Sequence, residues 1–191
     1  SYVISGRKSE MMDGMTREWY EDGHLQSEGV YTTGLRDGLW REYFEDGKLM
    51  SEAIYDRSKP SGAVTIYYPN GKTRSSGFYE VSGRSKKRTG HWVEYFDNGN
   101  EQSEGEYIGN KKQGRWREWY EEGGMKEDAF FDDGMYQGAY KAFHPNGKLM
   151  TEGEYKGERQ HQGLAHGAWK HYDENGVLLR TEFWYNGRKK G

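Results

Sequence analysis

One short pattern of glycines and aromatic residues occurs seven times along this 191-residue chain, and the repetition limits the folds available to it. Each unit opens with a glycine: Gly14, Gly38, Gly62, Gly90, Gly114, Gly138 and Gly167. A second glycine always follows nine residues later, and an aromatic residue follows after seventeen. The units are 24 residues apart, except for steps of 28 and 29. Such a period indicates stacked supersecondary units, each burying its apolar face on its neighbours.

Composition favours a thin fold built on large side chains over a thick globular core. Only 32% of the residues are hydrophobic, yet 16% are aromatic, and aromatic residues are scarce in disordered chains. A net charge of −3 lacks the basic excess expected of a nucleic-acid-binding protein. The chain has no cysteine, which excludes disulfides and thiolate metal sites, and no apolar run approaches the ~20 residues of a membrane span.

Each unit contains two short runs of residues around a polar turn that ends in the second glycine, as in Glu45-Asp46-Gly47. A two-residue type I′ loop would use only the last two residues of this triplet. A type I turn with a bulge would use all three and would place the glycine in the left-handed region. Pro69 and Pro145 suit the first central position of a type I turn, which requires φ near about −65°.

The side-chain pattern favours the bulged turn. With the opening glycine counted as position 0, this turn places positions 5, 11, 13, 15 and 17 on one face of the sheet, and these positions are mostly aromatic, aliphatic or small. The two-residue loop would divide the aromatic positions between two faces, because a slip of one residue reverses every side chain. The opposite face then carries positions 2 and 6 and is partly hydrated.

We therefore predict an all-β fold, an elongated, twisted antiparallel sheet or solenoid of seven β-hairpins with essentially no helix. The predicted repeats are 14–37, 38–61, 62–89, 90–113, 114–137, 138–166 and 167–187. Residues 1–13 resemble the second strand of an earlier repeat or a cap strand, and 188–191 form a tail. The start at Ser1 suggests a processed or excised chain, and the sequence gives no indication of the compartment.

The aromatic residues at positions 2 and 6 are the candidate partner-binding residues: Trp40, Trp92, Trp116, Trp169, Tyr20, Phe44, Tyr68, Phe96 and Tyr120. One interpretation is structural, in which these rings stack on neighbouring units as a second thin core. The other is an exposed row of Trp and Tyr, since these residues dominate binding hot spots. Such a row suits an extended protein surface better than a small molecule.

Several groups of residues could suggest a metal site or a catalytic site, but their positions in the repeat are better explained by structural roles. His161, His166 and His171 are five apart, whereas strand residues on one face are two apart, so we predict no metal site. Recurring serines such as Ser27 have no histidine at a recurring position, and acid pairs such as Glu121-Glu122 lie at turns. We predict no catalytic residue, no cofactor and no enzymatic activity. The basic segment Arg84–Arg88 is interpreted mainly as a solvated loop.

The seven-fold pattern resembles the MORN-repeat variant of bacterial proteins, the group often labelled YwqK-family antitoxins. The match rests on residues such as Gly38, Trp40, Tyr43, Gly47 and Tyr55, and it covers essentially residues 14–187. Unit-to-unit departures at Glu101, Asp128 and His144 argue against a uniform ladder of ligand sites. The resemblance implies a repeat scaffold that has no shared catalytic residues.

We therefore expect a non-enzymatic protein–protein interaction scaffold, in an antitoxin- or immunity-like role, with a toxin or scaffold protein as partner. One alternative is a cell-wall or carbohydrate-binding module, because aromatic rings stack on sugars or enclose quaternary ammonium groups. A second alternative is a peripheral protein that contacts lipid, as proposed for MORN repeats more widely. End-to-end self-association stays open, and nucleic acid is not an expected partner.

Overall fold

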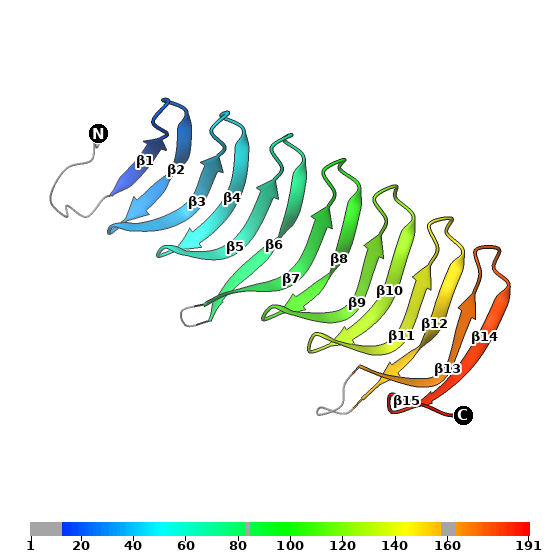
Figure 1. The fold of residues 1–191 in the computed structure, drawn as a ribbon. Coiled ribbons are helices and arrows are strands. Elements are labelled where there is room, and N and C mark those ends of the chain that lie inside the picture. Colours follow the sequence, from blue (N-terminus) through cyan, green and yellow to red (C-terminus); the bar gives the residue numbers. More distant parts are fainter. Residues whose placement is uncertain (1–12, 83–84, 158–162) are drawn as a thin grey trace. The chain divides into compact units, whose positions relative to one another are not determined.

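The computed structural model describes residues 13–82, 85–157 and 163–191, which form fifteen strands and no helix (Figure 1). The strands pair in antiparallel fashion, as in β1–β2 and β3–β4, and they follow one another in chain order within one open sheet. The predicted all-β class with hairpin repeats is confirmed. The N-terminal part of the expected cap strand and parts of the two long links, including His161, lie outside the described residues.

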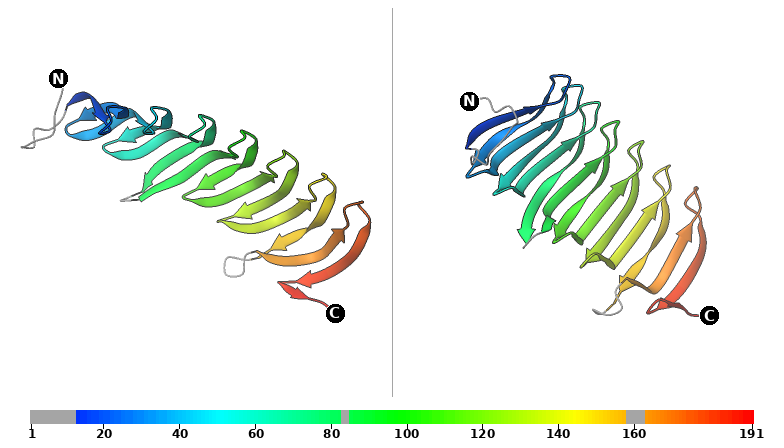
Figure 2. Two further views of the ribbon diagram at one scale, coloured as in Figure 1. Left: turned by 45° about the horizontal axis from the view of Figure 1, so that its top comes forward. Right: turned by 60° about the vertical axis from the view of Figure 1, so that its left-hand side comes forward.

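Residue contacts divide the chain into two compact units, here called unit 1 (1–87) and unit 2 (88–191). The strands up to the boundary are β1 Gly14–Trp19, β2 Leu25–Thr32, β3 Leu35–Tyr43, β4 Leu49–Asp56, β5 Lys59–Tyr67, β6 Thr73–Ser82 and β7 Ser85–Tyr95. Those that follow are β8 Glu101–Ile108, β9 Lys111–Trp119, β10 Met125–Asp132, β11 Met135–Phe143, β12 Leu149–Lys156, β13 Leu164–Tyr172, β14 Leu178–Tyr185 and β15 Arg188–Lys189. Within each unit, successive hairpins lie side by side (Figure 2).

Every hairpin closes with the bulged three-residue turn that the sequence favours. In β3–β4 the Phe44 N–H donates to Lys48 O at 2.8 Å, and the Gly47 N–H donates to Phe44 O at 2.9 Å. Gly47 has a φ of 80°, and the equivalent glycines of the other hairpins lie between 81° and 98°. Residues with a Cβ rarely adopt this left-handed conformation, so the fixed glycine is explained by the turn.

A second bulge in each hairpin makes the predicted distribution of side chains between the faces wrong. In β3–β4, Tyr43 pairs with Leu49 but the next residue, Glu42, pairs with Ser51, which leaves Met50 as an extra residue. The same register shift occurs in all seven hairpins. One extra residue reverses the facing of everything beyond it. Positions 13, 15 and 17 therefore share a face with position 2, whereas positions 5 and 11 lie on the opposite face.

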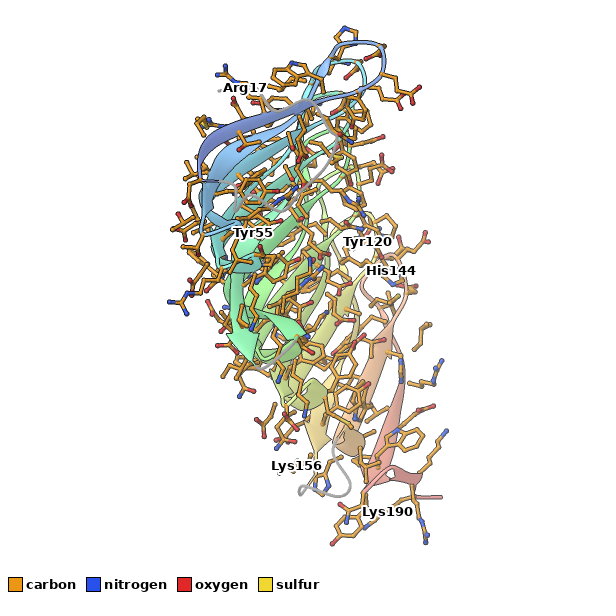
Figure 3. All side chains as sticks on the ribbon, turned by 90° about the vertical axis from the view of Figure 1, so that its left-hand side faces the viewer. Arg17, Tyr55, Tyr120, His144, Lys156 and Lys190 are labelled. Carbon is orange, nitrogen blue, oxygen red and sulfur yellow. The ribbon has the colours of Figure 1, made fainter. Side chains whose placement is uncertain are left out.

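The sheet thus has two different faces, and side chains project from both of them (Figure 3). We call the first the tryptophan face; in β3–β4 it carries Trp40, Glu42, Ser51, Ala53 and Tyr55. We call the second the charged face; in β3–β4 it carries Leu39, Arg41, Tyr43, Glu52 and Ile54. The core lies on the tryptophan face, because the buried apolar residues are concentrated there.

Three of the four buried indoles pack on a glycine of the preceding hairpin. A Cβ added to Gly29 would lie 2.3 Å from the Trp40 ring, and Gly105 and Gly153 have the same relation to Trp116 and Trp169. Where alanine replaces the glycine, the facing residue is smaller than tryptophan: Ala53 pairs with Val64, and Ala129 pairs with Tyr140. Position 15 of one hairpin and position 2 of the next therefore share a fixed space.

Candidate functional site

The four candidate tryptophans are core residues, so the structural interpretation of these rings is confirmed and the alternative of an exposed row is wrong. Trp40 and Trp92 are each 1% exposed, Trp116 is 3% and Trp169 is 6%. The second bulge causes this burial, because it turns position 2 toward the terminal aromatics. Trp40 contacts Tyr31 and Tyr55 edge-on, with ring centroids 5.0 and 6.4 Å apart. The indole faces are therefore not open for stacking on a sugar.

The candidate aromatics at position 6, namely Tyr20, Phe44, Tyr68, Phe96 and Tyr120, are half-buried. Two of them hold adjacent hairpins together: Tyr20 donates its hydroxyl to Tyr43 O at 2.7 Å, and Tyr120 donates to Phe143 O at 2.8 Å. His144 replaces an aromatic residue at this position and keeps the link, with its Nε2 3.0 Å from Tyr172 O (Figure 3). Position 6 thus connects hairpin ends.

Cations cover three of the four indole rings on the tryptophan face, those of Trp40, Trp92 and Trp116. The Arg36 guanidinium lies 4.1 Å from the Trp40 ring centroid and donates to Glu42 at 2.9 Å. Burial by itself lowers the pKa of Arg36, but its hydrogen bonds, first to Glu42, hold that pKa above its ordinary value. Arg36 therefore stays charged, and the ring, the cation and the carboxylate form one closed group.

A different cluster replaces this group at the junction of β10 and β11. Tyr136 and Tyr140 donate their hydroxyls to the two carboxylate oxygens of Glu127, at 2.9 and 3.1 Å. Burial, followed by the nearby charge of Glu127, raises the pKa of both tyrosines. The tyrosines therefore remain neutral donors at physiological pH. Their rings also contact Tyr155, with centroids 4.8 and 5.5 Å away, so this cluster is packed.

A row of alternating charges crosses the charged face of unit 1. Arg17 donates to Glu28 at 3.1 Å, and Arg41 lies 3.8 Å from Glu28 and donates to Glu52 at 2.8 Å. Tyr43 adds its hydroxyl to Glu28 at 2.9 Å, and this bond, followed by that of Arg17, lowers the pKa of Glu28. The row is neutral within itself, which makes it a poor binding site for a small charged ligand.

Beside this row lies a line of exposed apolar side chains, at repeat positions 1 and 16. We call it the unit 1 apolar stripe: Met15, Val30, Leu39, Ile54, Ala63 and Phe78. The five larger residues are 36–63% exposed. Three cross-strand pairs build the stripe, Met15 with Val30, Leu39 with Ile54, and Ala63 with Phe78. Ile54 also contacts the next hairpin, since a Cβ added to Gly62 would lie 3.1 Å from the Cβ of Ile54.

The same two positions in unit 2 are mixed: three of the four hairpins carry polar residues there, beside the exposed Phe130 and Phe183. His91 pairs across the strands with Glu106, and its ring nitrogens lie 3.4 Å from Glu104 and 3.3 Å from Glu106. Arg115 replaces an aliphatic residue and makes a two-pronged bond to Asp128, at 2.8 and 2.7 Å. Polar side chains thus interrupt the line in unit 2, whereas in unit 1 the apolar line is continuous over three hairpins.

The described residues that could suggest catalysis or metal binding do not form such a site. Three of the recurring serines, Ser27, Ser51 and Ser103, donate to position 4 carboxylates at 2.8, 3.3 and 3.4 Å. Among the described residues, no group of three or more His, Cys, Asp or Glu side chains is arranged to hold a metal ion. The same residues contain no helix long and apolar enough to cross a membrane.

The repeat frame agrees with a known sequence family. The MORN repeat variant matches the chain at residues 12–32, 36–57, 60–80, 88–108, 112–133, 136–156 and 165–187. The chain belongs to the MORN repeat variant family. A search of curated proteins found no match. The seven matched MORN repeats correspond to the seven hairpins, which confirms the resemblance to the MORN-repeat variant.

Proposed function

We propose that this MORN repeat protein is a non-enzymatic scaffold that binds another protein through the charged face of unit 1. The observation that carries the proposal is the unit 1 apolar stripe, whose five larger side chains are 36–63% exposed on a hydrogen-bonded sheet. Apolar side chains gathered in one exposed line are characteristic of protein-binding surfaces. The rigid sheet beneath them limits the ordering cost of binding.

The neighbouring charges indicate the chemistry of the partner. Arg17, Glu28, Arg41 and Glu52 neutralise one another, so they form a polar border that needs no compensating charge. An apolar centre with a polar border is the usual anatomy of a protein interface. The partner is therefore a separate protein with a flat apolar surface and few unpaired charges. An antitoxin- or immunity-like role, with a small toxin as this partner, is the specific form that we propose.

The test begins with a candidate partner, such as a protein encoded beside this one, and measures its affinity for the purified chain. We expect the double variant Leu39→Lys, Ile54→Lys to weaken binding by at least about tenfold, because it places charges in the apolar centre. The matched control is Ala139→Lys, Ala168→Lys, which adds the same charges at position 1 of two unit 2 hairpins.

Equal affinity of the stripe variant and the control would contradict the proposed interface. Self-association of the wild type that disappears in the stripe variant would identify a second copy of the chain as the occupant instead. For the antitoxin-like role, co-expression should relieve growth arrest caused by the partner, and the stripe variant should fail to relieve it. Growth arrest unaffected by the wild-type chain would exclude that role while leaving the scaffold function standing.

A further inference from the structure

Two arginines on the tryptophan face lie at the same repeat position and make the same contacts; we call this position the cation position. Arg36 and Arg88 lie two residues before the opening glycine of their repeats. Their guanidinium carbons are 4.1 and 4.6 Å from the centroids of the tryptophan rings beneath them. Each donates to the position 4 glutamate of its own hairpin at 2.9 Å. A planar cation between a ring and a carboxylate is thus the recurring occupant.

The fifth hairpin has a lysine at this position and an open cavity beside it. The Lys112 ammonium lies 4.4 Å from the Trp116 ring centroid and 3.2 Å from Glu118 Oε1. Lysine ends in a compact ammonium and lacks the planar five-donor fork of arginine. The adjacent cavity has a volume of about 130 Å³ and is lined by Glu94, Gln102, Ser103, Tyr107, Lys112, Trp116 and Glu118.

The two carboxylates that line this cavity have acceptor capacity to spare. Glu94 receives Arg88 on Oε1 at 2.9 Å, whereas its Oε2 accepts a long 3.4 Å bond from Ser103. Glu118 receives Lys112 on Oε1, whereas its Oε2 lies 3.9 Å from the Lys126 ammonium, beyond hydrogen-bond distance. An ionised carboxylate offers about four lone-pair sites, so both groups can accept further donors.

The strand register places these carboxylates on either side of one serine. Ser103 pairs with Glu94 on β7 and with Glu118 on β9, so the two glutamates flank it two strands apart. Adjacent strands are about 4.8 Å apart, which leaves room for a planar group between the carboxylates. Glu127 lies directly across from Glu118 and accepts tyrosine hydroxyls, so it adds negative charge without adding a cation.

We propose that this cavity is a binding site for a guanidinium group, supplied by free arginine or by an arginine side chain of a peptide or protein. The group donates N–H bonds to Glu94 and Glu118 above Ser103, in the manner that Arg88 and Arg36 use within their own hairpins. Paired N–H donors match carboxylate geometry, which a lysine ammonium does not. The site lies on the tryptophan face, apart from the unit 1 apolar stripe, and goes beyond the proposed scaffold function.

Nuclear magnetic resonance titration of the whole chain tests the proposal. The probes are guanidinium chloride far below denaturing concentrations, free arginine, capped arginine amide and capped lysine amide. The resonances followed are the Trp116 indole N–H, which donates to Glu106 O at 3.0 Å, and the Ser103 amide. We expect saturable shifts there with the guanidinium ion and both arginine compounds, and no saturable shift with the lysine compound. Binding of capped but not free arginine would identify a side chain within a chain as the source.

Two variants complete the test. Lys112→Arg supplies the guanidinium from within the chain, so we expect it to abolish the ligand-induced shifts and to raise the melting temperature by about 2–4 °C. Glu118→Gln removes one acceptor and should weaken binding by about tenfold or more. Arg36→Lys, which alters the equivalent position in unit 1, is the control and should leave the Trp116 and Ser103 shifts unchanged. Unchanged binding in Lys112→Arg, or equal shifts with lysine and arginine, overturns the proposal.

Discussion

Unit 1 and unit 2 use the same repeat for the interior of the sheet but differ on the charged face. In both units indoles pack on small residues of the preceding strand, as Trp40 does on Gly29 and Trp116 on Gly105. Positions 1 and 16, in contrast, carry only apolar pairs in unit 1, whereas in unit 2 Arg115 stands at position 1 and forms an ion pair with Asp128 at position 14. The repeat therefore fixes the residues of one face and leaves those of the other free to vary.

The largest expected loss of stability follows from removing a buried tryptophan, which both units have at the same repeat position. Trp40→Ala in unit 1 and Trp116→Ala in unit 2 should each lower the free energy of unfolding by about 3–5 kcal/mol, the usual loss for a buried aromatic ring. Similar losses are expected because both rings are almost fully buried. Denaturant unfolding monitored by circular dichroism measures both. A loss below about 1 kcal/mol for either variant would show that its tryptophan is not a core residue of that unit.

The second prediction tests the space shared between hairpins. Gly29→Ala should be destabilising by about 1–3 kcal/mol, because its Cβ would meet the Trp40 ring. Adding Trp40→Val recreates the Ala53–Val64 combination found at the next junction of unit 1, so the double variant should be more stable than the sum of the single losses predicts. Additive losses in this double-mutant cycle would mean that the two positions are independent.

The third prediction concerns the turns, which are alike in both units. Gly47→Val in unit 1 and Gly147→Val in unit 2 should each cost about 1–3 kcal/mol, because a β-branched residue is strained at φ values of 80° and 81°. Thermal unfolding measures the loss. Gly191→Val, at the chain end where an added Cβ meets no atom within 4 Å, is the control and should be neutral.

The smallest effect concerns acid stability on the charged face. The pKa of Glu28 is lowered, first by the Tyr43 hydroxyl and then by Arg17, so its contribution to stability is complete above the ordinary value of 4.5 and is lost as the pH falls through the lowered one. Tyr43→Phe removes the largest cause. We expect this variant to lose less stability than the wild type on acidification below pH 4.5. Parallel pH profiles would show that the hydroxyl does not set this pKa.

Most of the fold could be predicted from the sequence, but little of the candidate functional surface could. Glycine spacing predicted the hairpins. The Glu45-Asp46-Gly47 triplet was compatible with two turn types, and the bulged turn was favoured by a facing of side chains that the structure does not have. The bulge at Met50 has no comparable sequence signal, because its position tolerates Gln, Arg, Lys, Met and Leu. Without it, the tryptophans were assigned to the wrong face. The same error concealed the apolar stripe, although Leu39 and Ile54 occupy recurring positions whose aliphatic character in unit 1 was visible in the sequence.

Hydroxyl-radical footprinting of the protein, alone and with a candidate partner, tests most directly whether one face of the sheet buries the tryptophans while the other exposes the unit 1 apolar stripe. In the free protein, Met15, Leu39 and Phe78 should be modified readily, whereas Trp40 and Trp116 should be protected despite the high intrinsic reactivity of indole. Binding of the partner should protect the unit 1 apolar stripe and leave unit 2 positions such as His91 and Phe130 unchanged. Rapid modification of the two tryptophans in the folded protein, or protection confined to unit 2 on binding, would contradict the account.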